Sequence, residues 1–282
     1  MRPADTLFAS HPRRWRHFNY VYPVISRRCR GLSIGVNLNP DAACNFDCVY
    51  CCADRTPPRP DKHVDLSILA RELRSLSANW QSLFAEPEFQ ATPPELRRLN
   101  DIAFSGDGEP TIVPVFPEAA RIAVAVRREL SLDAVRIIVI TNGCGLTNPA
   151  VVDTLSLLDQ NNGEIWAKLD AGTEEYFQRV NRARWPLQRV LENILSAAKL
   201  RPIVIQSLFL RLHGTPPSAQ EVAAYCERLV WLLRAGGHIK LVQVYTVARR
   251  TREAYVAPLA AAELEQIAAE VRRAGLPVEV FP

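Results

Sequence analysis

Short apolar runs alternate with longer segments of helical periodicity along most of this chain of 282 residues. Val135–Ile140 is a run of Val and Ile with one Arg, which is typical of a buried strand. Leu187–Leu200 repeats Leu, Val and Ile at helical spacing, so one face of that segment is apolar. Six such strand–helix pairs follow one another between residues 31 and 275. This alternation predicts a parallel sheet covered by helices.

The expected strands are 31–38, 102–105, 135–140, 164–170, 203–210, 239–247 and a last one at 278–281. The expected helices are 65–79, 117–130, 149–158, 187–200, 218–235 and 260–274. A doubly wound sheet and an incomplete barrel both accommodate six such pairs. In both architectures the functional side chains lie at the carboxyl ends of the strands.

Composition excludes several classes of protein. Hydrophobic residues make up 48% of the chain and charged residues 23%, the ordinary range for globular domains, so a disordered or fibrous protein is excluded. No run of 18 apolar residues is present, and the first residues lack the apolar stretch of a signal peptide. We therefore expect a cytoplasmic protein with no membrane partner.

Positive charge is concentrated at the start of the chain. Residues 1–30 contain seven Arg and one Asp, whereas the net charge of the whole chain is only +4. We expect 1–30 to form a basic N-terminal arm and 31–282 to form the catalytic domain. Such an arm attracts phosphate, nucleic acid or an acidic protein. In the alternative, its aromatic residues pack against the barrel and its arginines are simply solvated.

Seven cysteines are present, and four of them fall within nine residues. Cys44, Cys48 and Cys51 form a CxxxCxxC pattern in the loop after the first expected strand. This clustering favours a metal site over a disulfide framework. Zinc requires a fourth ligand, for which the adjacent Cys52 is poorly placed and His63 is a candidate. Three thiolates can instead hold three irons of a [4Fe–4S] cluster and leave the fourth iron open.

CxxxCxxC with Tyr50 directly before the last cysteine resembles the motif of the radical S-adenosylmethionine (SAM) enzymes. The resemblance implies a partial barrel, a [4Fe–4S] cluster on the three cysteines and SAM bound at the open iron. It also implies reductive cleavage of SAM to a 5′-deoxyadenosyl radical, with electrons from a donor such as flavodoxin or ferredoxin. The radical then abstracts hydrogen from a substrate.

A second motif strengthens the resemblance. Asp107, Gly108, Glu109 and Pro110 are similar to the GGEP segment of that family, in which backbone and Glu bind the SAM amino group; Asp107 replaces a frequent Gly. The stretch 22–28 and the stretch 33–37 resemble the lead-in of Fe–S oxidoreductases related to the wyosine-tRNA radical enzyme. Only Cys29 precedes the motif, whereas the wyosine enzyme uses an additional N-terminal set of cysteines.

Four polar residues at or near the ends of later strands are further candidates for binding SAM. Lys168 and Asp170 share one face of their strand by its period of two, and we assign them to the SAM carboxylate and ribose. In the alternative they form a structural ion pair. Asn142 would bond the carboxylate or ribose unless it is an ordinary turn residue. Gln206 would contact adenine or substrate unless it is bonded to backbone.

The sequence thus predicts an α/β protein with a partial (β/α)6 barrel of radical SAM type. No catalytic residue is identified for the substrate step. A nucleotide, tRNA or another phosphate-bearing molecule is the leading substrate class because of the basic arm and the lead-in resemblance. An activase or modifier of a protein or peptide is the alternative. A non-catalytic zinc or nucleic-acid-binding protein is the third interpretation.

Overall fold

The computed structural model describes residue 13 and residues 15–53 and 62–282. The chain divides into two compact units. The first comprises the described parts of Met1–Ala43, Ala53–Ile140 and Asp153–Glu164. The second comprises Cys44–Cys52, Thr141–Val152 and Ile165–Pro282.

The bounds of the helices and strands confirm the six strand–helix pairs. The first unit holds β1 (Val21–Ser26), β2 (Gly31–Val36), α2 (Leu66–Ala78), the 3-10 helices η1 (Trp80–Ala85), η2 (Pro94–Leu96) and η3 (Pro110–Ile112), β3 (Leu99–Phe104), α3 (Phe116–Glu129) and all but the last residue of β4 (Arg136–Thr141). Helix α4 (Pro149–Asp159) has residues in both units. The second unit holds most of β5 (Gly163–Lys168), then α5 (Glu174–Asn181), α6 (Leu187–Leu200), β6 (Ile203–Leu208), β7 (Leu210–Leu212), α7 (Ala219–Arg234), β8 (Ile239–Tyr245), β9 (Val256–Pro258), α8 (Ala261–Arg273) and β10 (Val278–Phe281).

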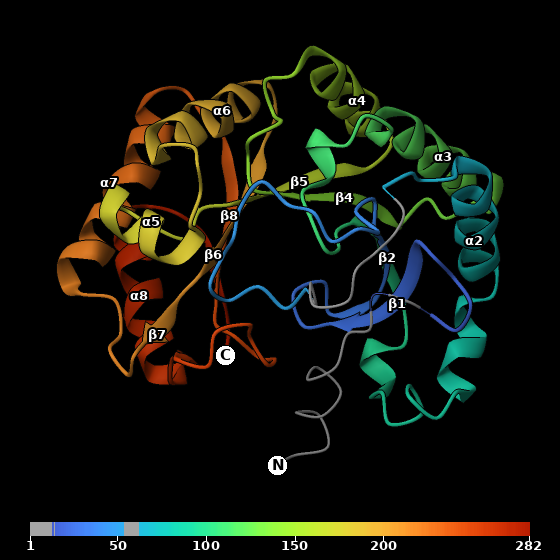
Figure 1. Ribbon diagram of the computed structural model, residues 1–282, viewed down its shortest axis with the longest axis horizontal. Helices are drawn as coiled ribbons and strands as arrows, with labels where there is room; N and C mark the ends of the chain where they lie inside the picture. The colour runs from blue at the N-terminus through green and yellow to red at the C-terminus, as the bar shows by residue number, and fades with distance from the viewer. Residues whose placement is uncertain (1–12, 14, 54–61) are drawn as a thin grey trace. The chain divides into compact units, whose positions relative to one another are not determined.

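The strands of the first unit are ordered β1-β2-β3-β4, with β1 antiparallel to β2 and the others parallel. Helices α2 and α3 lie side by side, and α2 packs against β1 and β2 (Figure 1). Tyr22 on β1 pairs with Gly35 on β2, and a Cβ on Gly35 would overlap the Tyr22 ring. β1 was not predicted from the sequence, because it lies within residues 1–30, before the segment in which strands and helices alternate.

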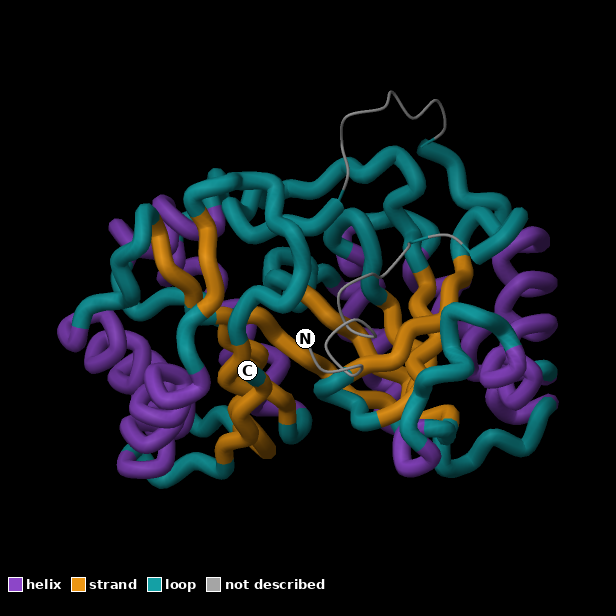
Figure 2. Tube along the Cα trace, turned by 90° about the horizontal axis from the view of Figure 1, so that it is seen from below, coloured by secondary structure: helices purple, strands orange, loops and turns teal. Residues whose placement is uncertain are grey.

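The strands of the second unit are ordered β5-β6-β8-β10, all parallel. The last strand, β10, lies beside β8 close to the C-terminus (Figure 2). A short antiparallel ribbon of β7 and β9 follows the end of β6, and α5 precedes α6. The sequence analysis missed both features, because an eight-residue helix and three-residue strands are too short to show periodicity. No helix in the described residues has the length and apolar character to cross a membrane.

A buried carboxylate fixes the start of β1. Glu72 on α2 accepts hydrogen bonds from the backbone N–H groups of Asn19, Tyr20 and Val21, at 2.7, 2.9 and 3.3 Å. The same segment buries the ring of Tyr20. Glu72 therefore holds the chain that enters the sheet of the first unit by accepting from three successive backbone donors.

We expect Glu72→Ala to lower the free energy of unfolding by about 1–3 kcal/mol, because it leaves buried backbone donors unsatisfied. The measurement is urea unfolding of the full chain. Glu118→Ala is the matched control, because Glu118 is an exposed helical Glu whose ion pair with Arg121 lies at the surface. Its effect should stay below about 0.5 kcal/mol. Equal losses in the two variants would contradict the anchoring role of Glu72.

Candidate metal centre and cofactor-binding residues

The loop that carries the three motif cysteines belongs to the second unit and is held there by its backbone. Val49 N–H donates to the Val180 carbonyl at 2.9 Å, and Asp47 N–H donates to the Asn181 carbonyl at 3.2 Å. On the other side, the N–H of Arg252 donates to the Cys51 carbonyl at 3.1 Å. These contacts fix the loop against the end of α5 and against the segment before β9.

Ion pairs reinforce the same attachment. The Asp47 carboxylate pairs with the guanidinium groups of Arg252 and Arg182, and Arg182 also pairs with Glu253 at 2.7 Å. Arg182 directly follows the last residue of α5 and caps the helix in the left-handed conformation, with φ of 45°. Two arginines from segments far apart in the sequence thus pair with Asp47 and hold the exposed edge of the cysteine loop.

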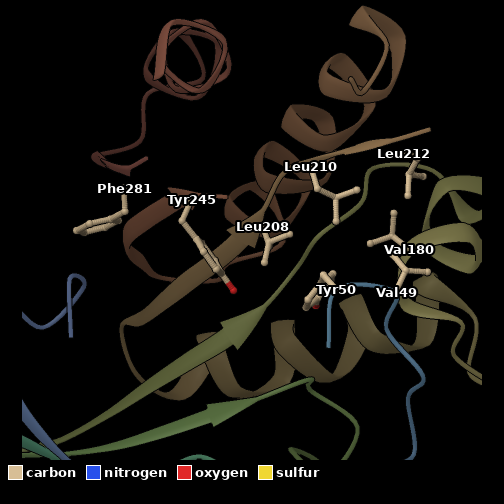
Figure 3. Close-up of a cluster of buried hydrophobic side chains, with 8 residues drawn as sticks. All are labelled: Val49, Tyr50, Val180, Leu208, Leu210, Leu212, Tyr245 and Phe281. Atoms are coloured by element: carbon tan, nitrogen blue, oxygen red, sulfur yellow. The ribbon is translucent and has the colours of Figure 1, made fainter. Parts of the chain in front are cut away.

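The loop packs against other side chains in a buried apolar cluster (Figure 3). Val49 and Tyr50 are buried among residues of the β6, β7, β8 and β10 strands and of α5. The other members of the cluster are Val180, Leu208, Leu210, Leu212, Tyr245 and Phe281. Leu208, Tyr245 and Phe281 are the last residues of three parallel strands. The loop therefore lies at the carboxyl ends of these strands. This is the edge at which the sequence predicts the functional residues.

The carboxylate of Asp170 joins the loop to β5 and β6. Its Oδ2 accepts from the Tyr50 hydroxyl and, at 3.0 Å, from Asn181 Nδ2. Its Oδ1 accepts from the backbone N–H of Leu208 at 2.9 Å and pairs with Lys168 Nζ at 3.4 Å. Asp170 is buried, so these protein donors replace its hydration. The ion pair between Lys168 and Asp170, which was the alternative to their assignment to SAM, is present.

Lys168 lies between two tyrosine rings. Its Nζ donates to the Tyr245 hydroxyl at 2.7 Å and lies 4.9 Å from the centre of the Tyr50 ring and 5.3 Å from that of Tyr245. Cation–π attraction adds to the charge of Asp170 at this position. Lys168, Tyr50, Asp170 and Tyr245 therefore form one connected polar group beneath the cysteine loop.

The electrostatics of this group follow from burial and from the Asp170 charge. Burial raises the pKa of the Tyr50 hydroxyl, and the neighbouring carboxylate raises it further, so Tyr50 stays a proton donor. Burial, with the same carboxylate, raises the pKa of the free Cys48 thiol to about 12. Burial lowers the pKa of Lys168, but the charge of Asp170 and the bond to Tyr245 outweigh it and leave this pKa above its ordinary value. Lys168 is thus a cation.

Asn142 and Gln206 also lie in the second unit, in different surroundings. Asn142 Nδ2 donates to the side-chain oxygen of Asn45, inside the cysteine motif, at 2.8 Å, and its Oδ1 accepts from the N–H of Cys144. Asn142 thus makes the turn bond of the alternative interpretation and also contacts the loop. Gln206 is buried and donates to Gln243 Oε1 at 2.8 Å, so it is bonded to a side chain and not to backbone.

The second motif lies in the first unit, between β3 and η3. Asn37 Nδ2 donates to Asp107 Oδ2 at 2.9 Å, and Asn37 Oδ1 accepts from the Asp107 N–H at 3.2 Å. A Cβ on Gly106 would overlap Asn37, and a Cβ on Gly108 would overlap Asn39 and the Ala43 carbonyl. Glycine is therefore required at both positions by the close approach of residues 37–43.

Glu109 and Pro110 start the 3-10 helix that ends this motif. The buried Glu109 carboxylate accepts from the N–H of Thr111 at 3.1 Å and from its hydroxyl at 2.6 Å. Pro110 occupies the first position of η3, where a missing N–H is tolerated. Glu109 is thus fixed in place by Thr111, which the sequence analysis did not single out.

The donor set of the loop fits an iron–sulfur cluster. Cys44, Cys48 and Cys51 are half-buried cysteines on one short loop, and none of them forms a disulfide. In the described part of the chain, no three His, Cys, Asp or Glu side chains are already gathered around a position for a metal ion. Of the candidate fourth zinc ligands, Cys52 is exposed and bonded to the Tyr50 carbonyl at 3.6 Å, and His63 is exposed on the first unit. Three thiols on one loop are the ligand number that a cluster with one open iron requires.

Two described arginines of the basic arm, Arg13 and Arg16, contact acidic and aromatic groups of the first unit. Arg13 lies over the Tyr22 ring, donates to its hydroxyl at 2.9 Å and lies 3.8 Å from Asp107 Oδ1. Arg16 pairs with Glu86 at 2.6 Å, and Trp15 packs edge-on against Phe89. The packing of Trp15 favours the packing interpretation of the arm, but Arg13 and Arg16 are paired with carboxylates and are not simply solvated. Residues 1–12 and Arg14 lie outside the described residues.

We expect Asn37→Asp to destabilise the chain most at neutral pH, because it places a second carboxylate beside Asp107. Melting temperatures measured between about pH 8 and about pH 4 should show the loss shrinking on acidification, because protonation of the introduced carboxylate removes the repulsion. Asn37→Leu removes the same hydrogen bonds without adding charge, so its loss should shrink less on acidification than that of Asn37→Asp. Parallel pH profiles for the two variants would contradict this contact.

Comparisons with known proteins bear on the fold. No family model and no curated protein matches the sequence. A radical SAM methyltransferase from Sphaerobacter thermophilus matches the structure with a TM-score of 0.62 and 17% identity, over 93% of this chain and 68% of that chain. TYW1 with a lysine-pyruvate adduct bound matches with a TM-score of 0.51 and 16% identity, over 87% of this chain and 74% of that chain. These likenesses confirm the predicted fold class: the chain is an α/β protein with the partial barrel of the radical SAM enzymes, the wyosine enzyme included.

Proposed function

We propose that the protein is a radical SAM enzyme whose single [4Fe–4S] cluster is held by Cys44, Cys48 and Cys51. The observation that carries the proposal is the position of the three thiols, on a loop seated at the carboxyl ends of β6, β8 and β10. The radical SAM fold supports it. When bound, the cluster and SAM supply one-electron cleavage of the sulfonium, which gives methionine and a 5′-deoxyadenosyl radical.

The residues of the second unit hold the loop and supply charge. Tyr50 and Asp170 fix the motif by their hydrogen bond, and Asn142 fixes Asn45 from the other side. Lys168 is the cation assigned to the SAM carboxylate. Both oxygens of Asp170 already accept protein hydrogen bonds, so its role in holding Tyr50 and Lys168 has direct support. Its contact with ribose stays a prediction, as does the contact of Gln206 with adenine or substrate.

The residues of the first unit are assigned to the amino group of SAM. Glu109 supplies a carboxylate that attracts the ammonium, and Thr111 fixes its orientation. Asp107, Gly108 and Pro110 shape the backbone on either side of it. The support for this assignment is the buried, preorganised carboxylate in a motif that resembles GGEP.

The proposal implies an external electron donor such as flavodoxin or ferredoxin and a reducing compartment, the cytoplasm. All seven cysteines lie within the described residues and form no disulfide, which supports a reducing compartment. The domain division at residue 30 stays a prediction.

The proposed substrate class is a nucleotide, tRNA or another phosphate-bearing molecule, and its support is the charge of the N-terminal arm. If the arm binds such a polyanion, affinity for RNA should fall steeply between about 50 and about 200 mM salt. Charge removal at Arg13, Arg14 and Arg16 should flatten this dependence. Affinity that does not change with salt would reject the proposed substrate class and leave the SAM chemistry intact.

We expect anaerobically reconstituted protein to be brown and to contain about four irons and four sulfides per chain. Alanine at Cys44, Cys48 or Cys51 should each abolish the cluster, measured by iron content and visible absorption. Cys226→Ala is the control, because Cys226 is a half-buried cysteine of α7 outside the motif. Cluster loss in this control with the fold intact, or zinc retained in a colourless protein, would overturn the proposal.

We expect Glu109→Gln to weaken SAM binding by about tenfold or more without loss of iron, because the ammonium loses a charged partner. The measurement is equilibrium binding of SAM to the cluster-loaded protein. Thr111→Val is the control for a change in the geometry of the loop, since it removes only the hydroxyl that orients Glu109. A larger loss in Thr111→Val than in Glu109→Gln would assign Glu109 to the loop and not to SAM.

A further inference from the structure

Asn181, the last residue of α5, faces the cysteine loop with both its backbone and its side chain. Its carbonyl accepts from the N–H of Asp47 at 3.2 Å. Its buried Nδ2 lies 3.0 Å from Asp170 Oδ2, 3.4 Å from the Tyr50 hydroxyl and 3.6 Å from Cys48 Sγ. The sequence analysis did not single out this residue, because no motif contains it.

The orientation of this amide is determined by its neighbours. A carboxylate, a sulfur and a hydroxyl oxygen already donating to that carboxylate are all acceptors, so the NH2 group has to face them. The amide oxygen, Oδ1, is buried without a hydrogen-bond partner in the described part of the chain. An unsatisfied buried oxygen is unfavourable, so the contacts made by Nδ2 must outweigh it.

An amide NH2 group has two hydrogens. One is directed to Asp170, which is the nearest and the charged acceptor. The Tyr50 hydroxyl contact is longer and its oxygen is already engaged as a donor, which leaves the second hydrogen for Cys48. A metal-bound cysteine is a thiolate and accepts more strongly than a thiol, so binding of a cluster strengthens this bond.

We propose that Asn181 is a positioning residue that donates a hydrogen bond to the Cys48 sulfur and thereby raises the reduction potential of the cluster. The inference rests on the proposed function, since it requires a cluster on the loop. Hydrogen bonds to cluster sulfurs stabilise the more negative, reduced state. Asn181 therefore opposes the nearby charge of Asp170, which favours the oxidised state.

The test is a redox titration of cluster-loaded full-length protein, followed by electron paramagnetic resonance of the reduced cluster. Asn181→Leu has a similar volume and no donor, and it should keep its iron and titrate at a more negative potential. Asn193→Leu is the matched control. Asn193 is a buried Asn of the same unit whose Nδ2 donates to the carbonyls of Gly143 and Cys144 and not to a sulfur of the motif. Its potential should stay at the wild-type value.

A second measurement needs no variant and stands even if Asn181→Leu fails to fold. Wild-type protein containing asparagine labelled with heavy nitrogen in the side-chain amide should show that nitrogen magnetically coupled to the reduced cluster. Absence of this coupling, or an unchanged potential in iron-loaded Asn181→Leu, would overturn the inference and leave the proposed function standing. A wild-type protein that binds no cluster at all would overturn both.

Discussion

The buried carboxylate of Asp170 is the group on which the candidate site depends. A charge without water has to be satisfied by protein donors, and the donors come from the cysteine motif, from the end of α5, from β6 and from Lys168. Each of them is thereby fixed relative to the others. This anion holds the loop of three thiols in the second unit together with the backbone bonds to α5, the ion pairs of Asp47 and the apolar cluster around Tyr50.

The first unit has a similar arrangement on a smaller scale. Asn37 bonds both the side chain and the backbone of Asp107, and the glycines on either side of Asp107 allow the two segments to approach. Glu109 then lies at the start of η3, held by Thr111. In both units a residue of the recognised motif is placed by an asparagine outside it, Asn181 in one case and Asn37 in the other. Mutations at these asparagines should therefore affect the geometry of the motifs as well as stability.

Periodicity predicted the six strand–helix pairs well, because each element is long enough to show its pattern. It missed β1, whose antiparallel pairing with β2 is decided by contacts such as that of Tyr22 with Gly35. It also missed α5, an eight-residue helix whose Asn181 and Val180 hold the loop. At the start of α7, Ser218 caps the helix, and the Glu221 carboxylate accepts from Gly172 and Thr173, a partner choice that the helical pattern of the sequence does not contain.

The sequence by itself indicated the proposed ligand type and number, because CxxxCxxC states which sulfur atoms are available to bind a metal and how far apart they lie along the chain. It also predicted that Lys168 and Asp170 lie close together, and they form an ion pair, although β5 ends at Lys168 and Asp170 lies beyond it. Only the tertiary structure decided that Asp170 holds Tyr50, that Lys168 lies between two tyrosine rings and that Asn181 reaches Cys48. Those partners are distant in sequence, so the contacts form only when folding brings the residues together and removes the water around their polar groups.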